Sequence, residues 1–251
     1  METIDGRFLH EHPSTHNSQR SLQHERHIYM QPWAHSIQAI AFDMDGLMVN
    51  TEELYTIVGH TILQRRDRKF TTDLKDRMTG LPGPVAWQLM IDLEQLSDTI
   101  DELELESKQI FAELLPQRLA PMPGLFELLD LLDARELPRC VATSSTRPFA
   151  DQVLQQIGAL DRVDFVVTAA DVARGKPWPD IYLSAAERMG TQPANMLVLE
   201  DSHHGSQAGL AAGTCTVAVP GEHSLHHDFS GVYARAASLH DPLIASLLPP
   251  P

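Results

Sequence analysis

The fold of this chain is constrained most by five short apolar runs that alternate with segments of helical periodicity. The runs cover residues 37–42, 140–142, 165–167, 196–199 and 215–219. None of them alternates apolar and polar residues, so each is typical of a strand that is buried on both faces. Buried strands separated by helices are typical of a parallel sheet that is covered by helices on both sides. The sequence therefore predicts an α/β fold.

Helical patterns fill the gaps between the apolar runs. The leucines of the first pattern recur at the i, i+3, i+4, i+7 spacing that places them on one helix face. A glycine follows each of the other three patterns, as is frequent just beyond a helix end. The predicted helices are 125–132, 149–157, 179–189 and 203–212.

One long segment lacks a convincing core strand. Between residues 54 and 120 helical patterns dominate, and a Gly/Pro-rich turn at 80–84 interrupts them. We therefore predict a helical cap domain over 54–120, inserted into a Rossmann-like core formed by 37–53 and 121–247. Residues 1–36 are polar and lack the apolar stretch of a signal peptide, so we expect a disordered extension there.

Composition narrows the classes of partner. The 251-residue chain has a formal net charge of -15, which disfavours nucleic acid and anionic membranes as partners. No apolar stretch is long enough to span a bilayer. The two cysteines, Cys140 and Cys215, lie inside apolar runs and are expected to be buried thiols. We expect a cytoplasmic protein that acts on a small molecule; the oligomeric state stays open.

Polar residues follow four of the five apolar runs, where each predicted strand ends. In an open parallel sheet, ligands bind beyond the carboxyl ends of the strands. Carboxylates there suit Mg²⁺, whereas hydroxyls, backbone N–H groups and a lysine suit phosphate. The residues are Asp43 and Asp45 after the first run, Thr143, Ser144 and Ser145 after the second, Lys176 after the third, and Glu200 and Asp201 after the fourth.

Each of these motifs also has an ordinary structural explanation. A lone Asp-x-Asp occurs in many surface loops, and hydroxyl or acidic residues after a strand are frequent helix N-caps. The Gly-Lys-Pro of 175–177 is a common loop sequence. It is their combination, in this order and each at a strand end, that points to a site for a cation and a phosphate.

The sequence resembles the haloacid dehalogenase superfamily, in its phosphatase and β-phosphoglucomutase-like branch with a helical cap. The resemblance covers residues 37–218 and depends on four stretches in family order. They read FDMDGLMVNTEELY, CVATSS, GKPWPDIY and LEDSHHGSQAGLAAG. The nearest relatives in this resemblance are sugar-phosphate and nucleotide phosphatases and β-phosphoglucomutase.

The resemblance implies catalytic and metal-binding roles. Asp43 would be the nucleophile that forms an aspartyl-phosphate, and Asp45 the general acid and then the general base. Mg²⁺ would be held by the side chains of Asp43 and Asp201 and by the backbone carbonyl of Asp45. Glu200 would bind the metal directly or through water.

The resemblance also implies the phosphate-binding residues. Thr143 and Lys176 would hold the phosphoryl oxygens, helped by the N–H of Ser144. Lys176 would in addition offset the negative charge of the nucleophile and the phosphate. Together these roles describe a Mg²⁺-dependent phosphatase for a small phosphorylated metabolite, such as a sugar phosphate or a nucleotide monophosphate.

Three positions depart from the family pattern. Asn50 stands where relatives usually have aspartate, and Tyr55 where β-phosphoglucomutase has a histidine. The turn Leu81-Pro82-Gly83-Pro84 carries no cation where that enzyme has a substrate-gripping arginine. The departures at Tyr55 and in the turn favour hydrolysis over the alternative, a phosphomutase of the β-phosphoglucomutase type, whereas Asn50 concerns the geometry of the flap and not the core reaction.

Two further alternatives come from other classes of protein. A catalytically idle binding protein on the same fold would often lack the nucleophile or a metal carboxylate, whereas this chain retains both. A receiver-type signalling domain does not fit the length of the chain or the inserted helices.

Three more residues have two interpretations each. His203 and His204 could serve the metal, but neighbours on a helix face different ways, which favours a packing role. Trp87 could stack on a substrate or belong to the core of the cap.

Overall fold

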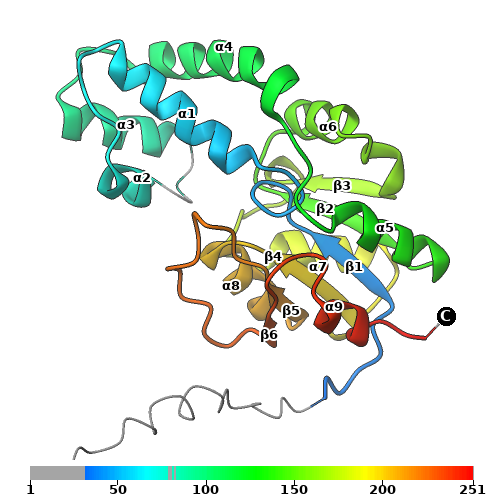
Figure 1. Cartoon of the computed structure of the whole chain (residues 1–251). Coiled ribbons are helices and arrows are strands. Elements are labelled where there is room, and N and C mark those ends of the chain that lie inside the picture. Colours follow the sequence, from blue (N-terminus) through cyan, green and yellow to red (C-terminus); the bar gives the residue numbers. More distant parts are fainter. Residues whose placement is uncertain (1–31, 79–80, 82, 251) are drawn as a thin grey trace, which may run out of the picture. The chain divides into compact units, whose positions relative to one another are not determined.

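The computed structural model describes residues 32–78, 81 and 83–250. The chain divides into two compact units, Met1–Pro32 and Trp33–Pro251, and the features below belong to the second. Its six strands form one parallel sheet in the order β3-β2-β1-β4-β5-β6 (Figure 1). The strands are β1 (Ala39–Phe42), β2 (Arg139–Thr143), β3 (Phe165–Thr168), β4 (Met196–Glu200), β5 (Cys215–Ala218) and β6 (Ala234–Arg235).

The helices outside the insertion cover the two faces of this sheet. Ile40 and Phe42 of β1 belong to the apolar core that includes α5 and α6, whereas Ala39 and Ala41 belong to the core with α7 and α8. Successive side chains of a strand point to opposite faces. Because helices cover both faces, every residue of β1 is buried, as the unbroken apolar run predicts. The helices are α5 (Leu125–Ala134), α6 (Arg147–Gln156), α7 (Asp180–Arg188), α8 (His203–Ala212) and α9 (Pro242–Leu247). The predicted α/β fold is confirmed.

The structure adds two elements that the sequence did not predict. Strand β6 has two residues and pairs with β5 through Val217↔Ala234 and Ala218↔Arg235. Helix α9 has six residues and starts after Asp241, whose side chain accepts a hydrogen bond from the N–H of Leu243. Both elements are too short to show a periodic pattern, so only pairing and packing against the sheet reveal them.

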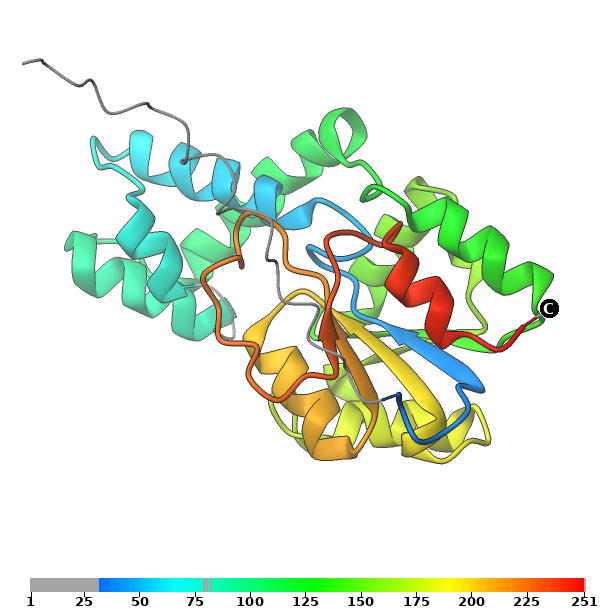
Figure 2. The same ribbon diagram turned by 60° about the horizontal axis from the view of Figure 1, so that its bottom comes forward.

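Four helices of the insertion form a cap that is separate from the sheet layers (Figures 1 and 2). Helix α4 contacts both α1 and α3, and α2 contacts α3. The inserted helical cap is confirmed, while the exact division at residues 54 and 120 stays a prediction. The helices are α1 (Thr51–Gln64), α2 (Thr72–Met78), α3 (Gly83–Glu94) and α4 (Ile100–Arg118).

Two antiparallel linkers join the cap to the core. Val49 forms an antiparallel bridge with Pro121, and the N–H of Met122 donates to the carbonyl of Met48 over 2.8 Å. Asn50 adds side-chain bonds, because its amide donates to the carbonyl of Arg118 over 3.1 Å and its Oδ1 accepts from Ala120 N–H over 2.8 Å. The asparagine that departs from the family pattern therefore both donates and accepts across the linkers, which an ionised aspartate cannot do.

The N-terminal prediction concerns mostly residues 1–31, which lie outside the described residues. Trp33 belongs to the folded unit, since its indole Nε1 donates to the carbonyl of Ala194 over 2.9 Å. Cys140 and Cys215 are buried and free, as expected from the apolar runs. Among the described residues, the helices all fall short of the length and apolarity that crossing a membrane requires.

Candidate active site

The site forms where β1 and β4 end side by side. The N–H of Asp43 donates to the carbonyl of Leu199 over 3.0 Å, so Asp43 continues the pairing of these strands. Glu200 and Asp201 follow at the end of β4, and all three acidic side chains are buried. The shared edge of a parallel sheet thus brings together carboxylates that are more than 150 positions apart in the sequence.

Lys176 lies between two of these carboxylates. Its Nζ is 2.5 Å from Asp43 Oδ1 and 2.6 Å from Glu200 Oε1, and it also donates to the carbonyl of Ala142 over 2.9 Å. Burial alone lowers the pKa of the Lys176 ammonium, but the carboxylates of Asp43 and Glu200 outweigh it and hold this pKa well above its ordinary value. Lys176 therefore remains a cation next to the predicted nucleophile.

The three carboxylates also form a group that can hold a metal ion. Asp43, Glu200 and Asp201 each offer an oxygen, and these oxygens lie within 4.8 Å of one another. Burial raises the pKa of Asp43 well above its usual range, against the opposing effect of Lys176. Burial and the neighbouring Glu200 carboxylate raise the pKa of Asp201 in the same direction. One ammonium does not balance three buried carboxylates, and a hard divalent cation such as Mg²⁺ fits this oxygen donor set.

Asp45 faces a different set of groups. Its Oδ1 accepts a hydrogen bond from the hydroxyl of Thr51 over 2.7 Å. Its Oδ2 accepts from the hydroxyls of Ser145 over 2.8 Å and Thr143 over 3.2 Å. The side chain of Asp45 is therefore oriented by three hydroxyls, while the three-carboxylate group forms without it.

The hydroxyls after β2 have distinct positions. Thr143 is buried, and its hydroxyl also accepts from the N–H of Ser145 over 3.0 Å. Ser144, the predicted phosphate-binding serine, is exposed next to it. The sequence placed three hydroxyls at this strand end but did not predict that Ser145 and Thr51 contact Asp45.

Glu200 has a complete set of hydrogen-bond donors. In addition to Lys176, the hydroxyl of Tyr182 donates to Oε1 over 2.7 Å. The N–H and hydroxyl of Ser202 donate to Oε2 over 3.2 and 2.9 Å. Four donors therefore occupy the approximately four lone-pair sites of this carboxylate. Sequence analysis did not identify Tyr182, although it lies in the quoted stretch GKPWPDIY.

A histidine that sequence analysis missed contacts one of the three clustered carboxylates. His223 Nε2 lies 2.7 Å from Asp201 Oδ2, and both side chains are almost fully buried. His223 belongs to segment 219–230, which follows β5 and carries no periodic pattern. The histidines that sequence analysis considered, His203 and His204, lie elsewhere: His203 Nδ1 contacts the carbonyl of Asp228, and the two rings contact each other.

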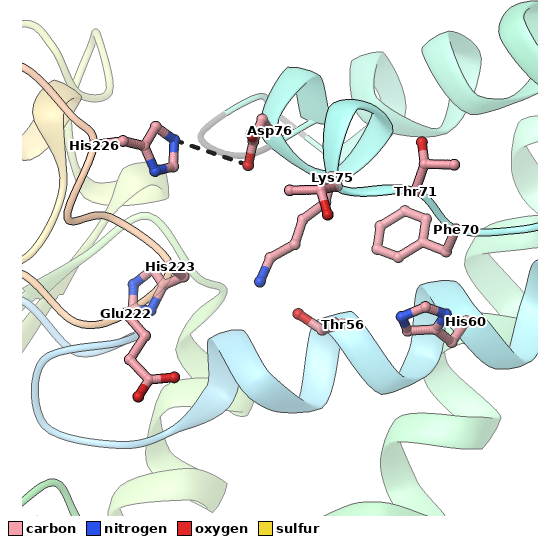
Figure 3. Close-up of a pocket in the computed structure, with 10 residues that line it drawn as sticks. Thr56, His60, Phe70, Thr71, Lys75, Asp76, Glu222, His223 and His226 are labelled. Carbon is pink, nitrogen blue, oxygen red and sulfur yellow. Dashed lines mark ion pairs between the residues drawn. The ribbon is translucent and has the colours of Figure 1, made fainter.

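A cavity of about 280 Å³ lies next to His223, between segment 219–230 and the cap helices α1 and α2 (Figure 3). Lys75 and Asp76 of α2 line it on the cap side, and Glu222, His223 and His226 on the core side. An ion-pair contact of 3.8 Å joins His226 Nε2 to Asp76 Oδ1 across it. The lining offers both hydrogen-bond donors and acceptors, and it carries one cation, Lys75, against the two anions Asp76 and Glu222.

Two aromatic residues of the cap have packing roles. Tyr55 is partly exposed, and its ring lies 4.7 Å from the ring of Phe111. Trp87 is partly buried and packs against the hydrophobic core cluster, outside the lining of the cavity. Of the two interpretations of Trp87, the structure supports the one in which it belongs to the core of the cap.

Comparison with known proteins identifies the class. The family model for haloacid dehalogenase-like hydrolases matches residues 40–219. The chain belongs to this family, and the superfamily predicted from the four motifs is confirmed.

Individual relatives agree with this assignment. The chain is 29% identical over 181 residues to the phosphorylated carbohydrates phosphatase of Thermotoga maritima, covering 70% of this chain and 82% of that protein. It is 32% identical over 206 residues to a probable pseudouridine-5'-phosphatase of Drosophila melanogaster, covering 80% and 89%. The fold is similar to that of a HAD family hydrolase from Deinococcus radiodurans, with a TM-score of 0.71, 25% identity and coverage of 86% and 99%.

Proposed function

We propose that this protein is a Mg²⁺-dependent phosphatase that hydrolyses a small phosphorylated metabolite through an aspartyl-phosphate on Asp43. The observation that carries the proposal is the meeting of Asp43, Lys176 and Asp201 at one edge of the sheet. The carboxylate of Asp43 can attack a phosphate ester there, because the Lys176 ammonium and a bound cation would offset the negative charge of the phosphate. Family membership and relatives that are named phosphatases support the same reaction.

The reaction proceeds in two displacements. A carboxylate oxygen of Asp43 attacks phosphorus, the bond from phosphorus to the substrate oxygen breaks, and Asp45 gives its proton to the leaving alcohol. Asp45 then takes a proton from a water molecule that attacks the aspartyl-phosphate, which releases phosphate and restores Asp43. Lys176 and Thr143 hold the phosphoryl oxygens, helped by the N–H of Ser144.

The bound metal would neutralise the charge that gathers on the transferring phosphoryl group. Asp43 and Asp201 would hold it by side chain, and Asp45 by its backbone carbonyl. Glu200 has a donor for each of its lone-pair sites, which supports an indirect role through water. In that role Glu200 fixes Lys176 next to the nucleophile.

We propose that the leaving group occupies the cavity next to His223 and that this group is rich in hydroxyls. The lining of the cavity mixes donors and acceptors, as hydroxyl groups require. Asp76 and Glu222 offset the charge of Lys75, so a second phosphate would meet little net positive charge. This balance favours a sugar phosphate or nucleotide monophosphate over the bisphosphate that a phosphomutase of the β-phosphoglucomutase type would use.

A screen of phosphorylated metabolites for phosphate release tests the proposal, with Mg²⁺ and with a chelator. We expect Mg²⁺-dependent release from at least one ester, and a loss of roughly 10³-fold or more in Asp43→Asn. The matched control is Asp161→Asn, which removes an exposed aspartate before the start of β3, at the opposite end of this strand from the site, and should keep full activity. Release that persists in Asp43→Asn would contradict the nucleophile, and isomerised product would favour the mutase. A chain that turns over no ester would be the idle binding protein.

A further inference from the structure

His223 has a position that the reaction above does not explain. Its Nε2 lies 2.7 Å from Asp201 Oδ2, and its side chain is only 11% exposed. Segment 219–230 is fixed next to the site, because the N–H of Val219 donates to the carbonyl of Glu200 over 2.6 Å. A turn follows, in which Ser224 N–H donates to the carbonyl of Gly221 over 3.0 Å. The backbone hydrogen bonds of this segment and the contact with Asp201 therefore both fix the position of the imidazole ring.

Two glycines make this contact possible. A Cβ on Gly46 would lie 2.5 Å from Asp201 Oδ2 and 2.8 Å from His223 Nε2, and one on Gly221 would lie 2.7 Å from His223 Cε1. Contacts under 3.0 Å are essentially never made by real Cβ atoms. Gly46 also has φ +84°, which disfavours a side chain at that position. Because both positions are glycines, no side chain from residue 46 or 221 blocks the contact between the His223 imidazole and the Asp201 carboxylate.

His223 lies beside the metal-binding group, not inside it. Among the described residues, the group whose ligand atoms lie close enough to share an ion contains Asp43, Glu200 and Asp201. A carboxylate has two oxygens, so Asp201 can accept from an imidazole on one and bind a cation with the other. Hydrogen bonds of this kind orient the ligands of metal sites and raise affinity.

We propose that His223 is a positioning residue that donates from Nε2 to Asp201 Oδ2 and thereby fixes this carboxylate for Mg²⁺. The proposal rests on the metal site of the proposed function. The same imidazole also lines the cavity (Figure 3), so His223 contacts both Asp201 and this space.

Calorimetric titration of the purified full chain with MgCl₂ tests the proposal without any substrate. His223→Leu keeps a similar volume but lacks a donor, and we expect it to weaken Mg²⁺ binding about tenfold or more. His223→Gln can place an amide N–H near the same oxygen, so its affinity should stay within about threefold of the unsubstituted chain. The control His227→Leu changes a histidine of the same segment that is outside the cavity lining, and should leave the affinity unchanged.

Several outcomes would overturn the proposal. Unchanged or tighter Mg²⁺ binding in His223→Leu would do so, and so would equal weakening in the Leu and Gln variants when both keep the far-UV circular dichroism of the parent. A directly coordinated nitrogen in the electron spin-echo spectrum of the Mn²⁺-loaded protein would make His223 a ligand instead. Failure of the unsubstituted chain to bind Mg²⁺ would remove the metal site and this proposal together. If Mg²⁺ binds as expected but no ester is hydrolysed, the role of His223 stands and the phosphatase proposal fails.

Discussion

Glu200 shows at the scale of one residue how a fully buried carboxylate is kept in the fold. An unpaired buried charge is costly, and removal of one partner of a buried ion pair typically destabilises a protein by about 3–5 kcal/mol. Lys176, Tyr182 and Ser202 supply the donors that Glu200 requires. The side chain also presses against the backbone of Gly205, where an added Cβ would overlap the carboxylate.

Gly205→Ala is therefore expected to destabilise the protein. The methyl group would displace the Glu200 carboxylate from its donors, at a cost of about 1–3 kcal/mol for overpacking. Urea unfolding followed by circular dichroism measures the difference, and phosphatase activity should fall with it because Lys176 would lose its fixed partner.

The control for this prediction is Gly83→Ala at the start of α3. Apart from its chain neighbours and its own helix backbone, a Cβ added there meets no described atom within 4 Å, although the proline that follows disfavours a side chain in helical backbone. We therefore expect a loss of stability for this variant that is much smaller than the loss for Gly205→Ala. If Gly205→Ala were as stable as the Gly83 variant, the close approach of Glu200 to the helix backbone would be wrong.

At the scale of elements, ion pairs connect the C-terminal end of α1 to α4 and to the segment just before α4. Arg66, just beyond the end of α1, lies 2.5 Å from an oxygen of Asp98 and 2.7 Å from an oxygen of Glu106. Thr99 adds a capping box with Glu102 that starts α4. These interactions stabilise the packing of the cap helices and involve no residue of the sheet.

The pH dependence of the Arg66 pair has a defined sign. The hydrogen bond from Arg66 lowers the pKa of Asp98 below its ordinary value. A carboxyl with a lowered pKa in the folded state stabilises that state above its ordinary pKa of about 4, and the stabilisation is lost as the pH falls through the lowered value. Arg66→Met should thus cost about 1 kcal/mol near neutral pH, and the difference should shrink below about pH 4.

Urea unfolding of both proteins at neutral and acidic pH measures this effect. Lys69→Met is the control, because Lys69 is exposed and forms no ion pair among the described residues. A difference for Arg66→Met that stays constant with pH would mean that packing of the long side chain, not its charge, supports the cap.

For the whole molecule, the proposed metal site predicts that cation binding raises stability. A cation that binds only the folded chain stabilises it by about 2.7 kcal/mol at a concentration of 100 times its Kd. For a protein of this length, this should raise the Tm by roughly 5–10 °C. Differential scanning calorimetry with MgCl₂, against KCl at equal ionic strength, measures the shift.

Asp201→Asn provides the matched variant for this coupling. It keeps the shape of the side chain but removes one of the clustered charges, so its Tm should respond little to Mg²⁺. An equal response in both proteins would place the stabilising Mg²⁺ outside the carboxylate group. No response in either would contradict the metal site.

The sequence by itself determined the layered fold and most of the candidate site. Strand and helix periodicities are local, so the apolar runs and glycine-ended helices could be located without any knowledge of contacts. Because the carboxyl ends of parallel strands meet at one edge, the residues after those runs had to converge. Asp43, Lys176 and Asp201 could thus be grouped from order and spacing, and their resemblance to family motifs supplied the roles.

Only the tertiary structure decided which neighbours orient these groups. Tyr182 donates to Glu200 from a helix, and His223 contacts Asp201 from a segment without periodicity. Ser145 donates to Asp45, whereas the adjacent Ser144 is exposed. The pairing of β6 with β5 is of the same kind. Such contacts join segments far apart in the chain through side-chain direction and close approach, and neither property leaves a periodic signal in the amino-acid order.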